Sequence, residues 1–359
     1  MTEVERSHRA AAPRPDANPE GSGLPAFLIT VDTEGDNLWA KPRDIRTDNA
    51  GYLPRFQALC ESYSLKPTYL TNFEMATSPV FVELARDAIA RGAAEVGMHL
   101  HAWNSPPLTP LTDDDFTHQP YLIEYPRAVM RQKIEFMTKL LEDTFQRKMR
   151  SHRAGRWAFD STYAKLLSEH DYDVDCSVTP GVSWTSSLGD PRREGGVDYT
   201  DFPGEAYFLD LDAIHQPGAS TLLELPMTIL DPRPRWLRHS VDSGSRWSPL
   251  RWLKGRMSRK VSWLRPRAST LSSLTSVLER TDAAGKRYAE LMLHSSEVMP
   301  GGNPHFETPE AVEELYAGLE QLFRSTRQRF RGLTLSEYYD ELTRTRPVAG
   351  HRVGEPNRQ

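Results

Sequence analysis

The stretch FLITVDTEGDN, residues 27–37, decides how the rest of this 359-residue chain is interpreted. Apolar residues and a threonine, typical of a buried strand, run directly into three carboxylates, Asp32, Glu34 and Asp36. Successive side chains of a strand point to opposite faces, so Asp32 and Glu34 share one face and Thr33 lies on the other. The stretch predicts either a strand that ends in a solvated turn or a site built at the end of that strand.

Similar apolar runs recur along the chain and alternate with segments of helical periodicity, which predicts parallel strands joined by crossover helices. Seven such strands favour a closed or nearly closed barrel, with an open doubly wound sheet as the competitor. The last long helix is expected to begin with Thr308 as N-cap and Pro309 at its first position. The candidate strands are 26–31, 67–72, 94–101, 149–154, 172–178, 222–229 and 288–296. The candidate helices are 51–64, 78–92, 125–145, 159–170, 308–330 and 334–344.

The composition of the chain limits the classes of protein to which it can belong. The formal net charge of -5 gives no general attraction to nucleic acid. Cys60 and Cys176 are too few for a disulfide framework, and no apolar run approaches the roughly 18 residues of a membrane span. We expect a disordered tail over residues 1–24, one barrel over 25–345 and a flexible tail over 346–359. These features predict a cytoplasmic protein of undetermined oligomeric state.

One segment, residues 232–267, departs from the pattern before the final strand. It holds eleven Lys or Arg against one Asp, with Trp236, Trp247, Trp252 and Trp263 interleaved. Within an insertion of about residues 231–270, such a segment could contact an anionic glycolipid or the inner face of a membrane. The alternative is a solvated basic excursion. No reader motif accompanies the charge, so we expect no nucleic-acid partner.

A second polar group follows the third candidate strand in EVGMHLHAW, residues 95–103. His99 and His101 are two residues apart in a strand and therefore share a face. Paired imidazoles at this spacing suit Zn²⁺ or a similar divalent ion. An isolated His-x-His is more often a surface or hydrogen-bonded pair, but both this pair and Asp32 fall at the carboxyl ends of parallel strands, where barrels build sites.

Two further residues complete the candidate site. Arg153, in SHRAGRW, ends the fourth strand, where it could orient a carboxylate base and keep it ionised. His294, in LMLHSSE, ends the last strand, which in a barrel closes beside the first. Taken alone, Arg153 is more simply explained as a surface arginine and His294 as a core histidine. Their order along the chain places a candidate acid, His294, opposite a candidate base, Asp32.

These residues together resemble a known family. TVDTE, EVGMHLH, HRAGR and LMLH, in that order, are similar to the motifs of the polysaccharide deacetylase superfamily, the NodB-homology or carbohydrate esterase family 4 enzymes. The resemblance covers about residues 25–345, including the closing LTLSEYYDEL. The segment ITVDTEGDNLW, residues 29–39, is most similar to the WalW-type branch. The resemblance implies a distorted (β/α)7-type barrel with a divalent metal, most often zinc.

The resemblance also implies roles for single residues. Asp32 corresponds to the base, Arg153 to the arginine that orients it and His294 to the general acid. The family's adjacent aspartate is replaced here by Thr33, so Glu34 takes the ligand role with two histidines. The family's histidines stand four apart, whereas position 103 is a tryptophan, so His99 and His101 are assigned. Trp103 and Asn37 are expected to contact substrate.

The implied reaction is deacetylation of an N-acetyl or O-acetyl sugar in a polysaccharide or glycolipid precursor. A metal ion would act as Lewis acid, Asp32 would accept a proton from water and His294 would protonate the departing amine. An amidohydrolase-type hydrolase also uses His-x-His, but on its first strand. A catalytically inactive sugar-binding barrel is the alternative from another class, although binding alone would not require Asp32, Arg153 and His294 together.

Overall fold

The first strand of the barrel, β1 (Ala26–Thr33), is the centre from which the sheet extends. The structure, a computed structural model, describes residues 23–36, 38, 44–187, 189–190, 195–230 and 261–344. Asn37, almost all of the two predicted tails and most of the predicted insertion at 231–270 lie outside the described residues.

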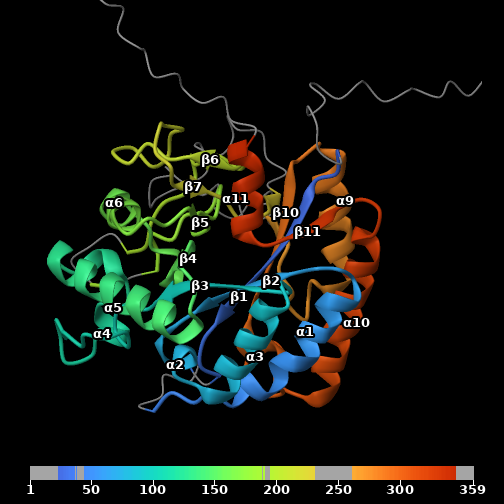
Figure 1. The fold of residues 1–359 in the computed structure, drawn as a ribbon, viewed down its shortest axis with the longest axis horizontal. Coiled ribbons are helices and arrows are strands. Elements are labelled where there is room, and N and C mark those ends of the chain that lie inside the picture. The colour runs from blue at the N-terminus through green and yellow to red at the C-terminus, as the bar shows by residue number, and fades with distance from the viewer. Residues whose placement is uncertain are drawn as a thin grey trace, which may run out of the picture.

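The main sheet has the strand order β10-β1-β2-β3-β4-β5-β7-β6, with β11 pairing to the start of β1. In the described part of the chain, eight of these nine strands run parallel, and β6 pairs antiparallel to β7. Figure 1 shows β1 and β10 side by side although they come from opposite ends of the chain. The strands are β1 (Ala26–Thr33), β2 (Pro67–Thr71), β3 (Glu95–Leu100), β4 (Ser151–Ala154), β5 (Val174–Asp175), β6 (Tyr207–Phe208), β7 (Leu223–Glu224), β8 (Ile229–Leu230), β9 (Ser262–Trp263), β10 (Tyr288–His294) and β11 (Arg331–Leu333).

All seven predicted strands are confirmed as parallel strands of a curled, barrel-like sheet. Two are much shorter than predicted, because β5 and β7 each pair over only two residues. Side chains replace the ladder there: Ser177 N–H donates to Asp175 Oδ1 at 3.0 Å, and Val178 N–H donates to Glu224 Oε1 at 3.0 Å. Short polar side chains that bond nearby backbone compete with strand pairing.

Helices cover the outer face of the sheet (Figure 1). Thr308 caps α10 by accepting from Ala311 N–H at 3.2 Å, and Pro309 opens the helix, as predicted. The apolar odd-numbered residues of β1, Phe27, Ile29 and Val31, pack in the main core with these helices. The helices are α1 (Leu53–Ser62), α2 (Phe73–Ala76), α3 (Pro79–Ala90), α4 (Asp115–His118), α5 (Arg127–Phe145), α6 (Ser161–Glu169), α9 (Leu274–Ala283), α10 (Pro309–Thr326) and α11 (Leu335–Arg344), with short 3-10 turns η2 (Asp48–Tyr52), η3 (Leu122–Glu124), η4 (Gly155–Trp157), η5 (Leu271–Ser273) and η6 (Ser295–Val298).

The barrel interior changes from apolar to charged along the strands. At the end where the strands begin, α11 buries Leu335 and Tyr338 against Ala26 and Leu28 of β1. Further along the same face come Thr30 and Asp32, and then Glu34 just after the strand, all buried. The carboxylates therefore lie at the carboxyl end of the strands, opposite the end that α11 covers.

The described helices and cysteines add two observations. None of the helices in the described part of the chain combines the length and apolar character that crossing a lipid bilayer requires. Cys60 and Cys176 are both free and buried, and burial raises the pKa of each thiol well above its ordinary value. Both cysteines therefore act as small apolar core residues.

Candidate active site

Three of the predicted residues meet at the carboxyl end of the barrel. Glu34 follows β1, while His99 and His101 lie at the end of β3, two strands away. One ligand atom from each lies within 4.8 Å of the others. Glu34 Oε2 is 2.9 Å from His101 Nε2 and 3.5 Å from His99 Nε2, and all three residues are buried. The structure thus places the three side chains close together, at the strand ends where parity predicts them.

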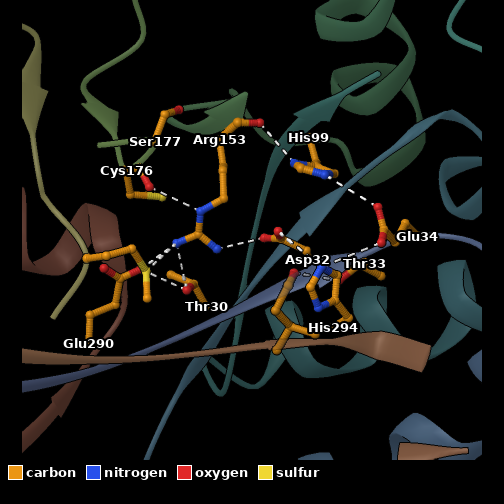
Figure 2. A network of polar contacts seen from close by, with 12 residues as sticks. Thr30, Asp32, Thr33, Glu34, His99, Arg153, Cys176, Ser177, Glu290 and His294 are labelled. Atoms are coloured by element: carbon orange, nitrogen blue, oxygen red, sulfur yellow. Dashed lines mark hydrogen bonds and ion pairs between the residues drawn. The ribbon is translucent and has the colours of Figure 1, made fainter. Parts of the chain in front are cut away.

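The second ring nitrogen of His99 fixes how this imidazole is presented. His99 Nδ1 lies 2.9 Å from the carbonyl oxygen of Arg153, which can only accept, so Nδ1 carries the hydrogen. His99 Nε2 then faces Glu34 (Figure 2). His101 Nδ1 is buried and has no partner among the described residues. Burial by itself would raise the pKa of Glu34, but hydrogen bonds from the two imidazoles hold it well below its ordinary value.

This donor set fits a divalent metal ion. Two imidazole nitrogens and one carboxylate oxygen are the ligand types of catalytic zinc, which keeps a further position open. The His99 Nδ1 contact to a backbone carbonyl is the orientation that supports ligation through Nε2. Among the described residues, Glu34, His99 and His101 are the only three-residue group of this kind.

Asp32 and Arg153 form a buried ion pair beside the metal-ligand candidates. Arg153 Nη1 donates to Asp32 Oδ1 at 2.6 Å, and Arg153 is completely buried (Figure 2). Burial by itself would raise the pKa of Asp32, but the charge of Arg153 and of nearby imidazoles brings it below its ordinary value. Asp32 is therefore ionised at neutral pH, with one oxygen held by Arg153.

The guanidinium of Arg153 is also held from its other side. Nη2 donates to Thr30 Oγ1 at 2.9 Å and to Glu290 Oε1, while Nε donates to the carbonyl of Cys176 at 3.1 Å. Burial raises the pKa of Glu290 to about 7, although the Arg153 charge opposes this rise. Arg153 thus joins two carboxylates: Asp32, near the carboxyl ends of the strands, and Glu290, nearer to where the strands begin.

His294 lies next to Asp32 because β10 pairs in parallel with β1 and the two residues are in register. His294 Nε2 is 4.0 Å from Asp32 Oδ2 and 3.7 Å from Glu34 Oε1, so it faces both carboxylates without a close hydrogen bond (Figure 2). On the other side, His294 Nδ1 is 3.0 Å from Arg265 Nη2 and 3.3 Å from Glu297 Oε1. Arg265 can only donate and Glu297 can only accept, so Nδ1 meets the first contact as a bare nitrogen and the second when it carries a hydrogen.

The backbone of Glu34 is anchored by neighbouring polar groups. Glu34 N–H donates to Ser295 Oγ at 3.0 Å, and the Glu34 carbonyl accepts from Asn49 Nδ2 at 2.8 Å. Asp36, unassigned from sequence, accepts from Asp48 N–H at 2.7 Å and from Asn49 N–H at 3.2 Å. Asp36 therefore shapes the turn and is not one of the residues that converge on the histidines.

Trp103 extends the site outward from His101. The two ring centroids are 5.4 Å apart, and the Trp103 ring meets Phe116 edge-on at 4.4 Å. Trp103 is half-buried. It occupies the sequence position at which the resemblance would place a second histidine, and His101 faces Glu34 instead.

Four of the residues that sequence reasoning missed contact Asp32, Arg153 or His294 directly or through one another. Thr30 and Glu290 were readable from parity, since each shares a strand face with a predicted residue, Asp32 or His294. Glu297 was signalled by the order His-Ser-Ser-Glu, because a glutamate three residues after a capping residue closes a capping box, as it does here. Arg265 gave no signal, because it lies in the basic segment and meets His294 only through the tertiary fold.

Neither a protein-family model nor a curated protein matches the sequence. Solved structures are similar in fold. One is described as a candidate polysaccharide deacetylase from Mycobacterium smegmatis, with 13% identity and a TM-score of 0.51, over 95% of this chain and 99% of that one. Another is a candidate glycoside hydrolase/deacetylase from Parabacteroides distasonis, with 11% identity and a TM-score of 0.57, over 90% and 72%.

The chain therefore shares the barrel-like fold of these two structures, which confirms the fold that the sequence motifs predict. At these identities the likeness establishes the architecture and not the reaction. The narrower WalW-type assignment stays a prediction.

Proposed function

We propose that the protein is a metal-dependent hydrolase that removes acetyl groups from N-acetyl amino sugars of a polysaccharide or glycolipid precursor. One observation carries the proposal: Glu34, His99 and His101 converge at the carboxyl end of the barrel strands beside Asp32 and His294. The similar structures are described as deacetylases, which supports the same class of reaction.

Glu34, His99 and His101 would hold a divalent ion, most simply Zn²⁺. When bound, such an ion supplies Lewis-acid polarisation of an acyl carbonyl and acidifies a water molecule. The residues around it are arranged for proton transfer. Asp32 uses one oxygen to bind Arg153, which leaves Oδ2 on the side of His294 to accept a proton from the attacking water. Arg153 keeps this base ionised and fixed in direction.

His294 is the acid of the proposed reaction. As an imidazolium, with Nδ1–H directed at Glu297 and Nε2–H facing Asp32 and Glu34, His294 would protonate the nitrogen of the departing sugar amine and become the neutral imidazole. A bond forms between the water oxygen and the acyl carbon, the C–N bond breaks, and the amine takes its proton from His294. The products are acetate and a free amino sugar. Trp103, beside His101, would pack against the sugar.

Two measurements on the purified protein test the proposal together. Elemental analysis should find a divalent metal near one per chain, and acetate should be released from N-acetylglucosamine oligomers. Chelation should abolish release, and Zn²⁺ should restore it. Metal without acetate release from any acetylated sugar would replace the proposal with an amidohydrolase-type reaction on another C–N bond. Absence of both metal and release would leave an inactive sugar-binding barrel.

A further inference from the structure

An unusual turn lies directly against the candidate metal ligands. In η4, Arg156 has φ 55° and ψ 26° and Trp157 has φ 61°, so two successive side-chain-bearing residues adopt the left-handed region. Each such residue costs about 1 kcal/mol or more and persists only where its surroundings impose it. Backbone strain of this kind places one side chain where a relaxed turn would not.

The packing of Gly155 explains what imposes the turn. A Cβ at this position would lie 2.6 Å from the carbonyl oxygen of Leu100 and 2.7 Å from Nδ1 of His101. The turn is therefore pressed against the end of β3, beside a candidate metal ligand. Arg156 follows at once, so its starting point is fixed relative to His101.

The Arg156 side chain continues an aromatic path that leads outward from His101. Its guanidinium carbon lies 5.1 Å from the centroid of Phe116, which meets Trp103 edge-on, and Trp103 in turn contacts His101. Arg156 is exposed. Arg156 therefore lies at the outer end of this path.

Among the described residues, Arg156 is not paired with a carboxylate, whereas the exposed Arg55 and Arg91 each donate to one. In the described part of the chain, Arg156 makes no hydrogen bond and no close ion pair. Its guanidinium lies over the face of Phe116, and the charges of Glu34 and Glu124 act on it at longer range. A ring face orients a guanidinium without occupying its N–H donors. Arg156 therefore offers these donors beside the candidate site.

We propose that Arg156 recognises an anionic group, a carboxylate or a phosphate, on the acetylated sugar while Trp103 and Phe116 pack against the apolar face of the ring. Guanidinium pairs in a bidentate way with both kinds of anion. This inference rests on the proposed function, because it names the substrate class of that same site. It makes Arg156 a residue that determines specificity, and gives it no part in the bond-breaking step.

Calorimetric binding of three probes tests the inference: neutral N-acetylglucosamine, N-acetylmuramic acid with its carboxylate, and N-acetylglucosamine 6-phosphate. The proteins compared are the unaltered chain, Arg156→Gln and Arg156→Lys. Arg327→Gln is the matched control. Arg327 is also exposed, and its guanidinium carbon lies 5.0 Å from the ring centroid of Tyr63, which is not one of the site residues. All are measured in phosphate-free buffer with metal present.

We expect at least one anionic probe to bind the unaltered chain and the Arg327 variant about 10-fold more tightly than the neutral sugar. Arg156→Gln should remove this preference and leave neutral affinity unchanged, and Arg156→Lys should retain part of it. An anion preference that survives Arg156→Gln, equal binding of all three probes, or no binding of any of them would overturn the inference.

Acetate release from the same samples separates this inference from the proposed function. Release from the neutral sugar without any Arg156-dependent preference would keep the deacetylase proposal and overturn the anion site. Arg156-dependent binding of an anionic probe without acetate release from any probe would keep the anion site and overturn the deacetylase proposal.

Discussion

His152 and Arg153 are neighbours in β4, yet they enter two different polar clusters on opposite faces of the sheet. The inner cluster, inside the barrel, comprises Asp32, Glu34, His99, His101, Arg153, Glu290 and His294. The outer cluster, toward α6, comprises His152, Tyr163, Asp175, Ser177 and Glu224. Both are buried and both combine histidine with carboxylate, so burial and composition do not distinguish them.

The difference lies in how the polar atoms are used. In the outer cluster, both ring nitrogens of His152 are taken, by Asp175 Oδ2 at 2.6 Å and by the Tyr163 hydroxyl at 2.7 Å. Ser177 Oγ donates to the same Asp175 oxygen at 2.9 Å. In the inner cluster, nitrogens of His99, His101 and His294 all face one carboxylate, Glu34. His152 completes its hydrogen bonds within the outer cluster, although Glu224 Oε2 has no partner among the described residues. The inner cluster instead directs several groups at a shared point, as a ligand or substrate requires.

The largest expected effect is on turnover, from Asp32→Asn in the inner cluster. Asparagine keeps an acceptor for Arg153 but cannot take a proton from water, so turnover should fall by about 10²–10⁴-fold. Metal content, measured by elemental analysis, should stay unchanged. Asp175→Asn in the outer cluster is the matched control and should leave turnover per folded molecule close to that of the unaltered chain. If metal is lost together with activity, Asp32 is a ligand and its role as base is wrong.

Glu34→Gln should weaken metal binding by at least about 100-fold, because a neutral amide replaces the anionic ligand. The measurement is the metal retained after dialysis, followed by calorimetric titration with Zn²⁺. Glu224→Gln provides the comparison, since Glu224 is equally buried but belongs to the outer cluster. Retention of metal by Glu34→Gln would return Glu34 to the role of a hydrogen-bond partner for the histidines.

His152→Phe should test the outer cluster through stability. Burial lowers the pKa of His152, so the neutral ring is what bridges Asp175 and Tyr163. Phenylalanine fills a similar volume but leaves a buried carboxylate and a hydroxyl without this partner, which should cost about 3 kcal/mol in the free energy of unfolding. Urea unfolding measures the loss, and Zn²⁺ affinity of the folded fraction should be retained. A stable variant that binds no metal would show that the two clusters are one functional unit.

The strands and the inner carboxylates and histidines were predictable because their signals are local. Alternating side chains put Asp32 with Glu34 and His99 with His101, and parallel strand ends put the pairs together. Parity also separates His152 from Arg153, since neighbours in a strand face opposite ways. Parity likewise placed Glu290 on the face of His294, where it was overlooked. What parity does not supply is its partner across the sheet, Arg153.

The remaining features depend on tertiary contacts that have no sequence period. Arg265 reaches His294 from a segment without regular secondary structure signals. The left-handed turn at Arg156 follows from the close approach of Gly155 to His101, which sequence spacing does not reveal. The shortened β5 and β7 follow from side-chain bonds made by Asp175 and Glu224, which compete with the ladder only once the strands are adjacent.

The smallest expected effect concerns the pH dependence of stability and involves Glu290. This carboxylate lies in β10 four residues before His294, on the side away from the metal-ligand candidates. Because burial raises its pKa from 4.5 to about 7, the folded chain keeps a proton that the unfolded chain has already lost in this interval. Its contribution to stability is fully present below about pH 4.5 and is lost as pH rises through about 7.

Glu290→Gln should therefore gain stability relative to the unaltered chain as pH rises, by about 2 kcal/mol between about pH 5 and pH 6.5. The amide still accepts from Arg153 and Thr30, so the network keeps its geometry. The measurement is the difference between the unfolding free energies of the two proteins at each pH. Glu74, whose pKa burial also raises to about 7, is common to both proteins and cancels in this difference. A pH-independent difference would mean that Glu290 is ionised throughout, with Arg153 balancing two carboxylate charges in the inner cluster.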